Sequence, residues 1–299
     1  MGKNKIAVIG AGKLAHSLTS ALLNAGYPVQ SVISRKLSSA KSLAKKFSIP
    51  DFSSSIQKIP ADVKIYFITV PDGEIQKVAK NLSKLKRDFS NSICVHFSGV
   101  ENINALHSLV RKDCAVGSLH IIRPFPSKNI VDLRNFPASI ETKDKHVNNF
   151  LIQLCKKLKL KPHSINSDEK IFHHLAAVHS SNFLVGNLFN AFYLIDSNND
   201  LPKVILRQTT QTALENAFKL SPAKALSGPI DRGDIYTIKK HIDALDSRIK
   251  QAKSKEKLTL LKKNYIFQSL ALLEVVKAKY GRLNKNHLKI KNLLKSKFD

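Results

Sequence analysis

Cysteine, tryptophan and long apolar runs are scarce in this sequence, and each absence excludes a class of protein. The chain of 299 residues contains three cysteines and no tryptophan. Cys94, Cys114 and Cys155 form no C-x-x-C pair, which argues against disulfides or zinc and favours buried thiols in a reducing compartment. No apolar run approaches the length of a membrane span, and no signal peptide precedes the first strand. We therefore expect a soluble, cytoplasmic protein with no membrane partner.

Acidic residues are also few beside the basic ones. The chain has 49 lysines and arginines against 22 aspartates and glutamates, a formal net charge of +27. Such a charge is typical of proteins that bind nucleic acid or anionic membranes. The lysines are nevertheless spread along the chain, with extra density after Lys250, and no nucleic-acid motif accompanies them. We expect no nucleic-acid role, and the charge leaves two alternatives, a polyanionic partner or attraction of a phosphorylated cofactor.

The N-terminus carries the pattern around which the rest of the chain is organised. Residues 5–9 are a short apolar run typical of a strand buried on both faces, and a helical pattern reaches about Ala25 before Gly26. The turn between them reads G-x-G-x-x-A and consists of Gly10, Ala11, Gly12, Lys13, Leu14 and Ala15. Strand, glycine turn and helix in this order indicate a dinucleotide site, with the pyrophosphate on the helix N-terminus. The alternative is a glycine turn without a ligand.

The end of the second predicted strand, residues 29–34, indicates which dinucleotide is bound. An NAD-selective site places an acidic residue there to hold the ribose 2′-hydroxyl. This chain has Ser34, Arg35 and Lys36 instead. Arg35 can stack on adenine and bind a 2′-phosphate, and Ser34 can donate a hydrogen bond to it. The sequence therefore favours NADP(H), with a solvated basic turn as the alternative.

Strands and helices alternate until about residue 166, and only helices follow. Further strands are predicted at 65–70, 93–98, 115–120, 137–141 and 160–165, with helices at 38–47, 74–85 and 143–159. Later helices are predicted at 168–196, 201–220, from 222, from 234 or 237 to 245, at 253–280 and from 287. This pattern predicts an α/β fold, a Rossmann-type doubly wound sheet in residues 1–166, followed by an all-helical domain in residues 167–299.

Polar residues follow several predicted strands where ligands bind in doubly wound sheets. We expect cofactor contacts from four residues at these strand ends, Val70, Pro71, Asp72 and Ser98. Asp72 is also a candidate N-cap for the next helix. His96 and His120 are candidate proton donors, with structural hydrogen bonding as the alternative.

Several motifs follow one another in the order seen in a bacterial family. They are the 10–15 turn, Val70-Pro-Asp72, His96-Phe-Ser-Gly99, Ser118-Leu-His120, Ser181-Asn182 and Gly228-Pro-Ile-Asp-Arg-Gly-Asp234. The chain thus resembles Rossmann-like NADP oxidoreductases with a C-terminal helical domain of unknown function, which are similar to pyrroline-5-carboxylate reductase, ketopantoate reductase and the 6-phosphogluconate dehydrogenase group. The resemblance implies a 6-phosphogluconate-dehydrogenase-like helical domain that dimerises and closes over the substrate.

Two departures from the pattern concern the proton donor. Ile121 follows His120 where the family has proline. The similar 3-hydroxyacid dehydrogenases carry a catalytic lysine four residues before an asparagine, but Val178 stands four residues before Asn182, and Lys170 is three turns away. We therefore expect that lysine machinery to be absent and a histidine to take its role: His120 or His96, or His174 or His179 from the first long helix.

These observations predict an NADP(H)-dependent oxidoreductase that reduces a small carbonyl or imine acid. Asn182 is expected to position the substrate or the nicotinamide. Arg232 is expected to hold an anionic group, the alternative being an ion pair with Asp231 or Asp234. The rival function is an NADP(H)-binding sensor or scaffold without turnover.

The first long helix also predicts the assembly. It carries a long apolar stripe that one globular neighbour rarely covers, consisting of Phe172, Leu175, Ala176, Phe183, Leu184, Leu188 and Phe192. We therefore expect a homodimer through the helical domain.

Overall fold

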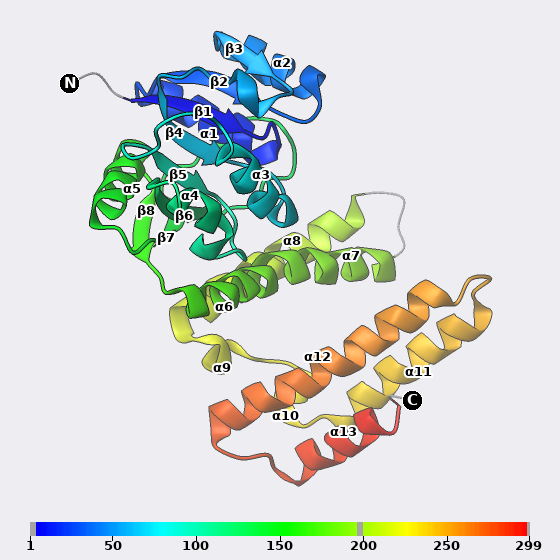
Figure 1. The fold of residues 1–299 in the computed structure, drawn as a ribbon. Helices are drawn as coiled ribbons and strands as arrows, with labels where there is room; N and C mark the ends of the chain where they lie inside the picture. Colours follow the sequence, from blue (N-terminus) through cyan, green and yellow to red (C-terminus); the bar gives the residue numbers. More distant parts are fainter. Residues whose placement is uncertain (1–3, 196–199, 298–299) are drawn as a thin grey trace. The chain divides into compact units, whose positions relative to one another are not determined.

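A computed structural model of the protein describes residues 4–195 and 200–297. The chain divides into two compact units, Met1–Leu184 and Val185–Asp299. The first contains the sheet with its helices, and the second contains only helices (Figure 1). Within the described residues, no helix combines the length and the apolar character that crossing a membrane requires.

The first unit is built on one eight-stranded sheet in the order β3-β2-β1-β4-β5-β6-β7-β8. The strands are β1 Lys5–Ile9, β2 Val29–Ile33, β3 Asp51–Ser53, β4 Val63–Ile68, β5 Ile93–His96, β6 Ala115–Ile121, β7 Pro137–Glu141 and β8 Lys161–Ser164. The first six are parallel, β7 runs antiparallel to β6, and β8 runs parallel to β7. The order reverses between β1 and β4, the switch point where doubly wound sheets bind ligands. The predicted fold class is therefore confirmed.

Helices cover both faces of this sheet because its strands are apolar on both sides. The bounds are α1 Lys13–Asn24, α2 Leu37–Lys46, η1 Ile56–Lys58, η2 Asp72–Glu74, α3 Ile75–Leu82, η3 Ile103–Leu106, α4 His107–Val110, α5 Lys145–Lys157 and α6 Ser167–Ala177. Ile6 and Val8 point into the core with α1, α2 and α5, whereas Ala7 and Ile9 point into the core with α3 and α4. All three cysteines are free and buried, and burial raises the pKa of the Cys114 thiol to about 12.

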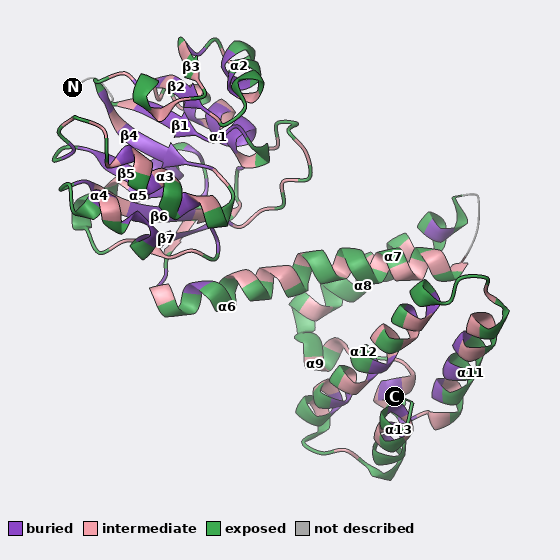
Figure 2. Cartoon of the chain, turned by 45° about the vertical axis from the view of Figure 1, so that its right-hand side comes forward, coloured by how far each residue is buried: buried purple, intermediate pink, exposed green. Residues whose placement is uncertain are grey.

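The second unit has its core among its later helices. Its elements are α7 Phe183–Ile195, which begins at the end of the first unit, α8 Leu201–Leu220, α9 Pro222–Ala225, α10 Pro229–Arg232, α11 Ile235–Gln251, α12 Glu256–Tyr280 and α13 Lys285–Lys295. Buried residues from α10 to α13 form one cluster that includes Ile238, Ile266 and Ile290. In contrast, Pro202 is the only buried residue that the structure describes on α7 and α8 (Figure 2).

Several local predictions need correction. Asp72 opens the turn η2 and caps no helix, and α6 begins after Asn166 without a side-chain cap. The predicted single helix 168–196 contains a π-helical turn, η4 Val178–Asn182, and its predicted end lies outside the described residues. A π turn adds a residue, so the predicted apolar stripe does not continue in phase across it. Asp234 does cap α11, accepting from the Thr237 N–H at 3.0 Å.

The predicted boundary near residue 166 coincides with the end of the sheet, since β8 ends at Ser164 and only helices follow. The compact unit extends further, to Leu184, because α6 packs against the sheet through Lys170. The division into functional domains 1–166 and 167–299 stays a prediction.

Candidate functional site

The glycine turn after β1 fits closely against the end of β4. Gly10 has φ +118°, and a Cβ added there would lie 2.6 Å from the Thr69 backbone carbonyl, so only glycine fits. Gly12 is the N-cap of α1 and makes no side-chain cap, which leaves the first N–H groups of the helix available. Ala15 is fully buried, as close packing of α1 on the strands requires. These features fit a bound pyrophosphate.

A cavity of about 810 Å³ opens beside this turn at the carboxyl ends of β1, β2 and β4. Its size is within the range of small-molecule sites. Eight predicted cofactor residues line it, namely Gly10, Ala11, Gly12, Ser34, Arg35, Lys36, Val70 and Pro71. The other four, Lys13, Leu14, Asp72 and Ser98, do not line it.

The cavity wall is strongly basic. Arg35, Lys36, Lys77 and Lys128 line it, and Glu74 is the single acidic residue among the lining residues that the structure describes. The Arg35 side chain is 81% exposed, and its guanidinium lies 3.7 Å from the Glu74 carboxylate. An exposed guanidinium on a basic wall suits a phosphate ligand such as the 2′-phosphate of NADP(H).

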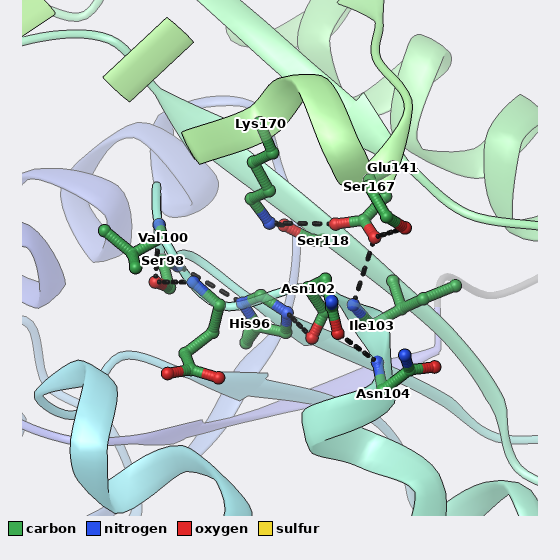
Figure 3. A network of polar contacts seen from close by, with 11 residues as sticks. His96, Ser98, Val100, Asn102, Ile103, Asn104, Ser118, Glu141, Ser167 and Lys170 are labelled. Atoms are coloured by element: carbon green, nitrogen blue, oxygen red, sulfur yellow. Dashed lines mark hydrogen bonds and ion pairs between the residues drawn. The ribbon is translucent and has the colours of Figure 1, made fainter. Parts of the chain in front are cut away.

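A buried ion pair lies on the same sheet, where α6 packs against β6 and β7 (Figure 3). The Lys170 ammonium lies 3.0 Å from the Glu141 carboxylate and also donates to the Ser118 hydroxyl. The other carboxylate oxygen accepts from the Ile103 N–H at 3.1 Å and from the Ser167 hydroxyl at 2.6 Å. Both charged side chains are almost completely buried. Desolvation lowers the pKa of Lys170, and the Glu141 charge opposes this shift.

His96 lies fully buried at the end of β5, next to that pair. Its Nε2 donates to the Asn102 carbonyl at 3.2 Å, and its Nδ1 accepts from the Ser98 N–H at 3.3 Å. Burial, followed by the Lys170 charge, lowers the pKa of His96 to about 3. The Ser98 hydroxyl accepts hydrogen bonds from two backbone N–H groups of the next loop. These contacts favour a positioning role for His96 and Ser98, and their predicted catalytic and cofactor roles stay predictions.

His120 and His174 converge on Gly99. Their ring centroids are 5.7 Å apart, and a Cβ added to Gly99 would lie 2.5 Å from His174 and 2.8 Å from His120. Burial, followed by the nearby charges of His174 and Lys170, lowers the pKa of His120 to about 4, while Asp72 opposes the shift. The His120 imidazole is therefore neutral at pH 7 and can accept or pass on a proton.

The remaining predicted site residues have separate surroundings. In η4 the Asn182 amide oxygen accepts from the Ser181 hydroxyl at 2.9 Å. Arg232 is exposed at the end of α10 in the second unit. Asp231 pairs with Lys279 at 3.0 Å, and among the described residues no ion pair joins Arg232 to Asp231 or to Asp234. The Thr237 hydrogen bonds, aided by the Arg232 charge, lower the pKa of Asp234. The roles predicted for Asn182 and Arg232 stay predictions.

The sequence analysis missed the most buried charged group of the site. A catalytic lysine was expected only four residues before Asn182, where Val178 stands, so no role was assigned to Lys170, which packs on the sheet. The signal was the spacing from Lys170 to His174, because residues four apart lie on one face of a helix. Glu141 is its partner because it is directly opposite Ser118 in the β6–β7 register.

Comparisons with known proteins agree with this architecture. Residues 5–97 match the family model described as NADP oxidoreductase coenzyme F420-dependent, and residues 136–257 match the domain of unknown function DUF2520. The resemblance seen in the sequence is thus confirmed: an NADP oxidoreductase domain precedes a DUF2520 domain. A search of curated proteins finds no match.

Solved structures share the fold at low sequence identity. A candidate NADP oxidoreductase from Bacteroides fragilis is 24% identical, with a TM-score of 0.73 over 94% of this chain and 99% of that chain. A reductive aminase from Aspergillus terreus in complex with NADPH and ethyl-5-oxohexanoate is 12% identical, with a TM-score of 0.57 over 99% and 93%. A pyrroline-5-carboxylate reductase from Coxiella burnetii is 14% identical, with a TM-score of 0.55 over 91% and 99%.

Proposed function

We propose that this chain, an NADP oxidoreductase domain followed by a DUF2520 domain, is an NADP(H)-dependent reductase of a small carbonyl or imine acid. The proposal rests on one observation, that the predicted cofactor cavity and the candidate proton donor lie at the same edge of the sheet. The basic cavity around Gly10 and Arg35 and the cluster around His120 and Lys170 both lie toward the carboxyl ends of the parallel strands in the first unit. The similar reductive aminase, which is in complex with NADPH and a keto ester, supports this class of chemistry.

The residues that line the cavity have the chemistry that NADP(H) requires. Gly10, Gly12 and the N-terminus of α1 would hold the pyrophosphate. Ser34 and Arg35 would hold the 2′-phosphate, since arginine binds phosphate oxygens through two parallel N–H groups. When bound, the cofactor supplies the hydride.

The protein must supply one proton to the oxygen or nitrogen that is reduced. His120 is our candidate donor, because it lies next to the last residue of β6 at this edge and can exchange a proton there. The Lys170 ammonium lies close enough to lower the pKa of His120. Since Glu141 and Ser118 hold that ammonium, we assign Lys170 the role of fixing the local charge and holding α6 in place.

NADPH consumption tests this proposal. We expect turnover with a member of a panel of 2-keto acids, cyclic imines and aldehydes. The panel includes oxidised coenzyme F420, because the matching family is described as F420-dependent. His120→Ala should abolish turnover while NADPH affinity and melting temperature stay nearly unchanged. The matched control is His146→Ala, which alters an exposed histidine on α5.

Two results would contradict the proposal. Tight NADPH binding without turnover of any panel member would favour the sensor or scaffold function. Unchanged activity in His120→Ala would remove His120 as the donor.

We also propose that the protein is a homodimer through α7 and α8. These helices expose large apolar side chains, including Val185 at 66%, Phe189 at 61%, Val204 at 72% and Phe218 at 87%. Apolar surface of this extent commonly marks a protein interface. Light scattering at micromolar concentration should report the mass of two chains, and a monomer would contradict the proposal.

A further inference from the structure

A series of histidines extends from the surface of the first unit toward the buried Lys170–Glu141 pair. His173 is exposed on α6, and its ring centroid lies 5.9 Å from that of half-buried His163 on β8. In the strand register His163 is opposite Ser139 on β7, and Ser139 is opposite His120 on β6. Residues directly opposite one another point to the same face of a sheet. His163, Ser139 and His120 therefore form a row across three strands on the face that carries Lys170's partners.

The spacing along this row suits stepwise proton transfer. Adjacent strands lie about 4.8 Å apart, so Ser139 bridges about half of the distance between the two histidines. Its side chain is 2% exposed, which places a hydroxyl inside the row. At the 5.9 Å separation of the His173 and His163 rings, one water molecule can link the ring nitrogens.

The four histidine rings also have no competing hydrogen-bond partner among the described residues. Within the described part of the chain, no hydrogen bond or ion pair fixes His120, His163, His173 or His174, whereas both nitrogens of His96 are engaged. The charges of Lys170 and Asp72 act on His120, and those of Glu141, Asp72 and Glu101 act on Lys170. Burial lowers the pKa of His120 and of His163, so at neutral pH a proton that reaches either ring is readily passed on.

We propose that His173, His163, Ser139 and His120 form a proton relay that carries protons from bulk solvent to the substrate. This inference rests on the proposed reductase function. In each turnover the substrate carbon gains a hydride from NADPH, and its oxygen or nitrogen gains the N–H proton of the neutral His120 ring. As that proton leaves, the relay delivers a proton from water to the other ring nitrogen of His120, so the ring stays neutral and hydroxide is left in the solvent. The relay carries no electrons. His173 and His163 thus act through His120 and touch no substrate.

Variants of the two outer histidines test the relay in the full-length protein. In dilute buffer above neutral pH, we expect His163→Gln and His173→Gln to lower kcat by about tenfold, part of the effect of a general acid. KM, NADPH affinity and melting temperature should not change. Added free imidazole should restore the rate by carrying protons in place of the missing ring, and the solvent isotope effect on kcat should rise. His146→Gln, which alters an exposed histidine on α5, is the matched control.

Each other outcome overturns the inference in a recognisable way. If the parent protein turns over and both variants keep its rate and isotope effect in dilute buffer, the relay is absent and the reductase function stands. A loss of rate with a lower melting temperature and no rescue by imidazole would show a structural role. A parent protein that consumes no NADPH would remove the proposed function and the relay with it.

Discussion

Removing either partner of the buried Lys170–Glu141 pair should destabilise the protein with opposite pH dependences. Glu141→Gln keeps an acceptor for the Ile103 N–H but leaves the ammonium without a counter-ion. Lys170→Met leaves the carboxylate with only the Ile103 N–H and the Ser167 hydroxyl. Loss of one partner of a buried pair costs about 3–5 kcal/mol, because a charge stays buried and unpaired.

A change in the protonation state of the unpaired group limits these costs at pH 7. A buried ammonium can lose its proton, which costs about 4.6 kcal/mol for a lysine of ordinary pKa, at 1.36 kcal/mol per pH unit. A buried carboxylate can gain a proton, which costs about 3.7 kcal/mol for an ordinary glutamate. The expected loss of unfolding free energy is therefore about 3–4.6 kcal/mol for Glu141→Gln and about 3–3.7 kcal/mol for Lys170→Met.

The direction of the pH dependence follows from which state binds more protons. In Glu141→Gln the folded state holds fewer protons than the unfolded state, so stability relative to the parent rises as the pH increases from 7 toward 10. In Lys170→Met the folded state holds more protons, so relative stability rises as the pH decreases from 7 toward 4. The double variant buries neither charge and should lose only about 1 kcal/mol, with little pH dependence.

Urea denaturation followed by circular dichroism, at several pH values between 4 and 10, measures these differences. A cost below about 1 kcal/mol for both single variants would refute the reasoning, since that is the usual value of an exposed pair. Equal pH slopes for the two variants would also refute it.

Further changes test the cofactor site, the assembly and the anion holder. Arg35→Ala should weaken NADPH binding by about tenfold or more in calorimetric titrations and leave NADH nearly unchanged; equal affinities of the parent for both cofactors would contradict this. Gly10→Ala should lower the free energy of unfolding by about 1–3 kcal/mol and abolish NADPH binding, because the φ of Gly10 and a neighbouring backbone carbonyl exclude a Cβ. Gly73→Ala is the control, since a Cβ there meets no atom within 4 Å. Phe218→Glu should give monomers in light scattering, and a persisting dimer would exclude this helix from the interface. Arg232→Ala should abolish turnover at unchanged melting temperature; a loss of activity only in proportion to unfolding would show a structural role.

The fold was predictable because local patterns and global topology agree. Each apolar run in the first unit became a strand close to its predicted bounds, and β1 matches residues 5–9. The short helix over residues 103–110 was missed because it contains few turns and little periodicity. The reversed direction of β7 was not predicted either, since strand direction depends on packing between segments distant in sequence.

The candidate site was only partly predictable. Gly10 and Arg35 belong to a contiguous fingerprint, so their location in the cavity follows from local sequence. Lys170 and Glu141 are 29 residues apart, and only the β6–β7 register and the packing of α6 bring them together. A charged residue on a predicted helix usually faces solvent, so the four-residue spacing from Lys170 to His174 was not enough by itself to predict that this lysine is buried.

The positions of β7 and β8 also determine how many residues must lie between the end of β8 and Lys170 on α6. β8 ends at Ser164, opposite Ile140 of β7, and α6 then contacts Glu141 through Ser167, Ser118 through Lys170 and the His120 ring through His174. One residue added between Ser164 and Lys170 would rotate the helix by about 100° and advance it by 1.5 Å. Every contact would then be lost together. We therefore expect the protein to tolerate a substitution between Ser164 and Lys170 better than an insertion or deletion there.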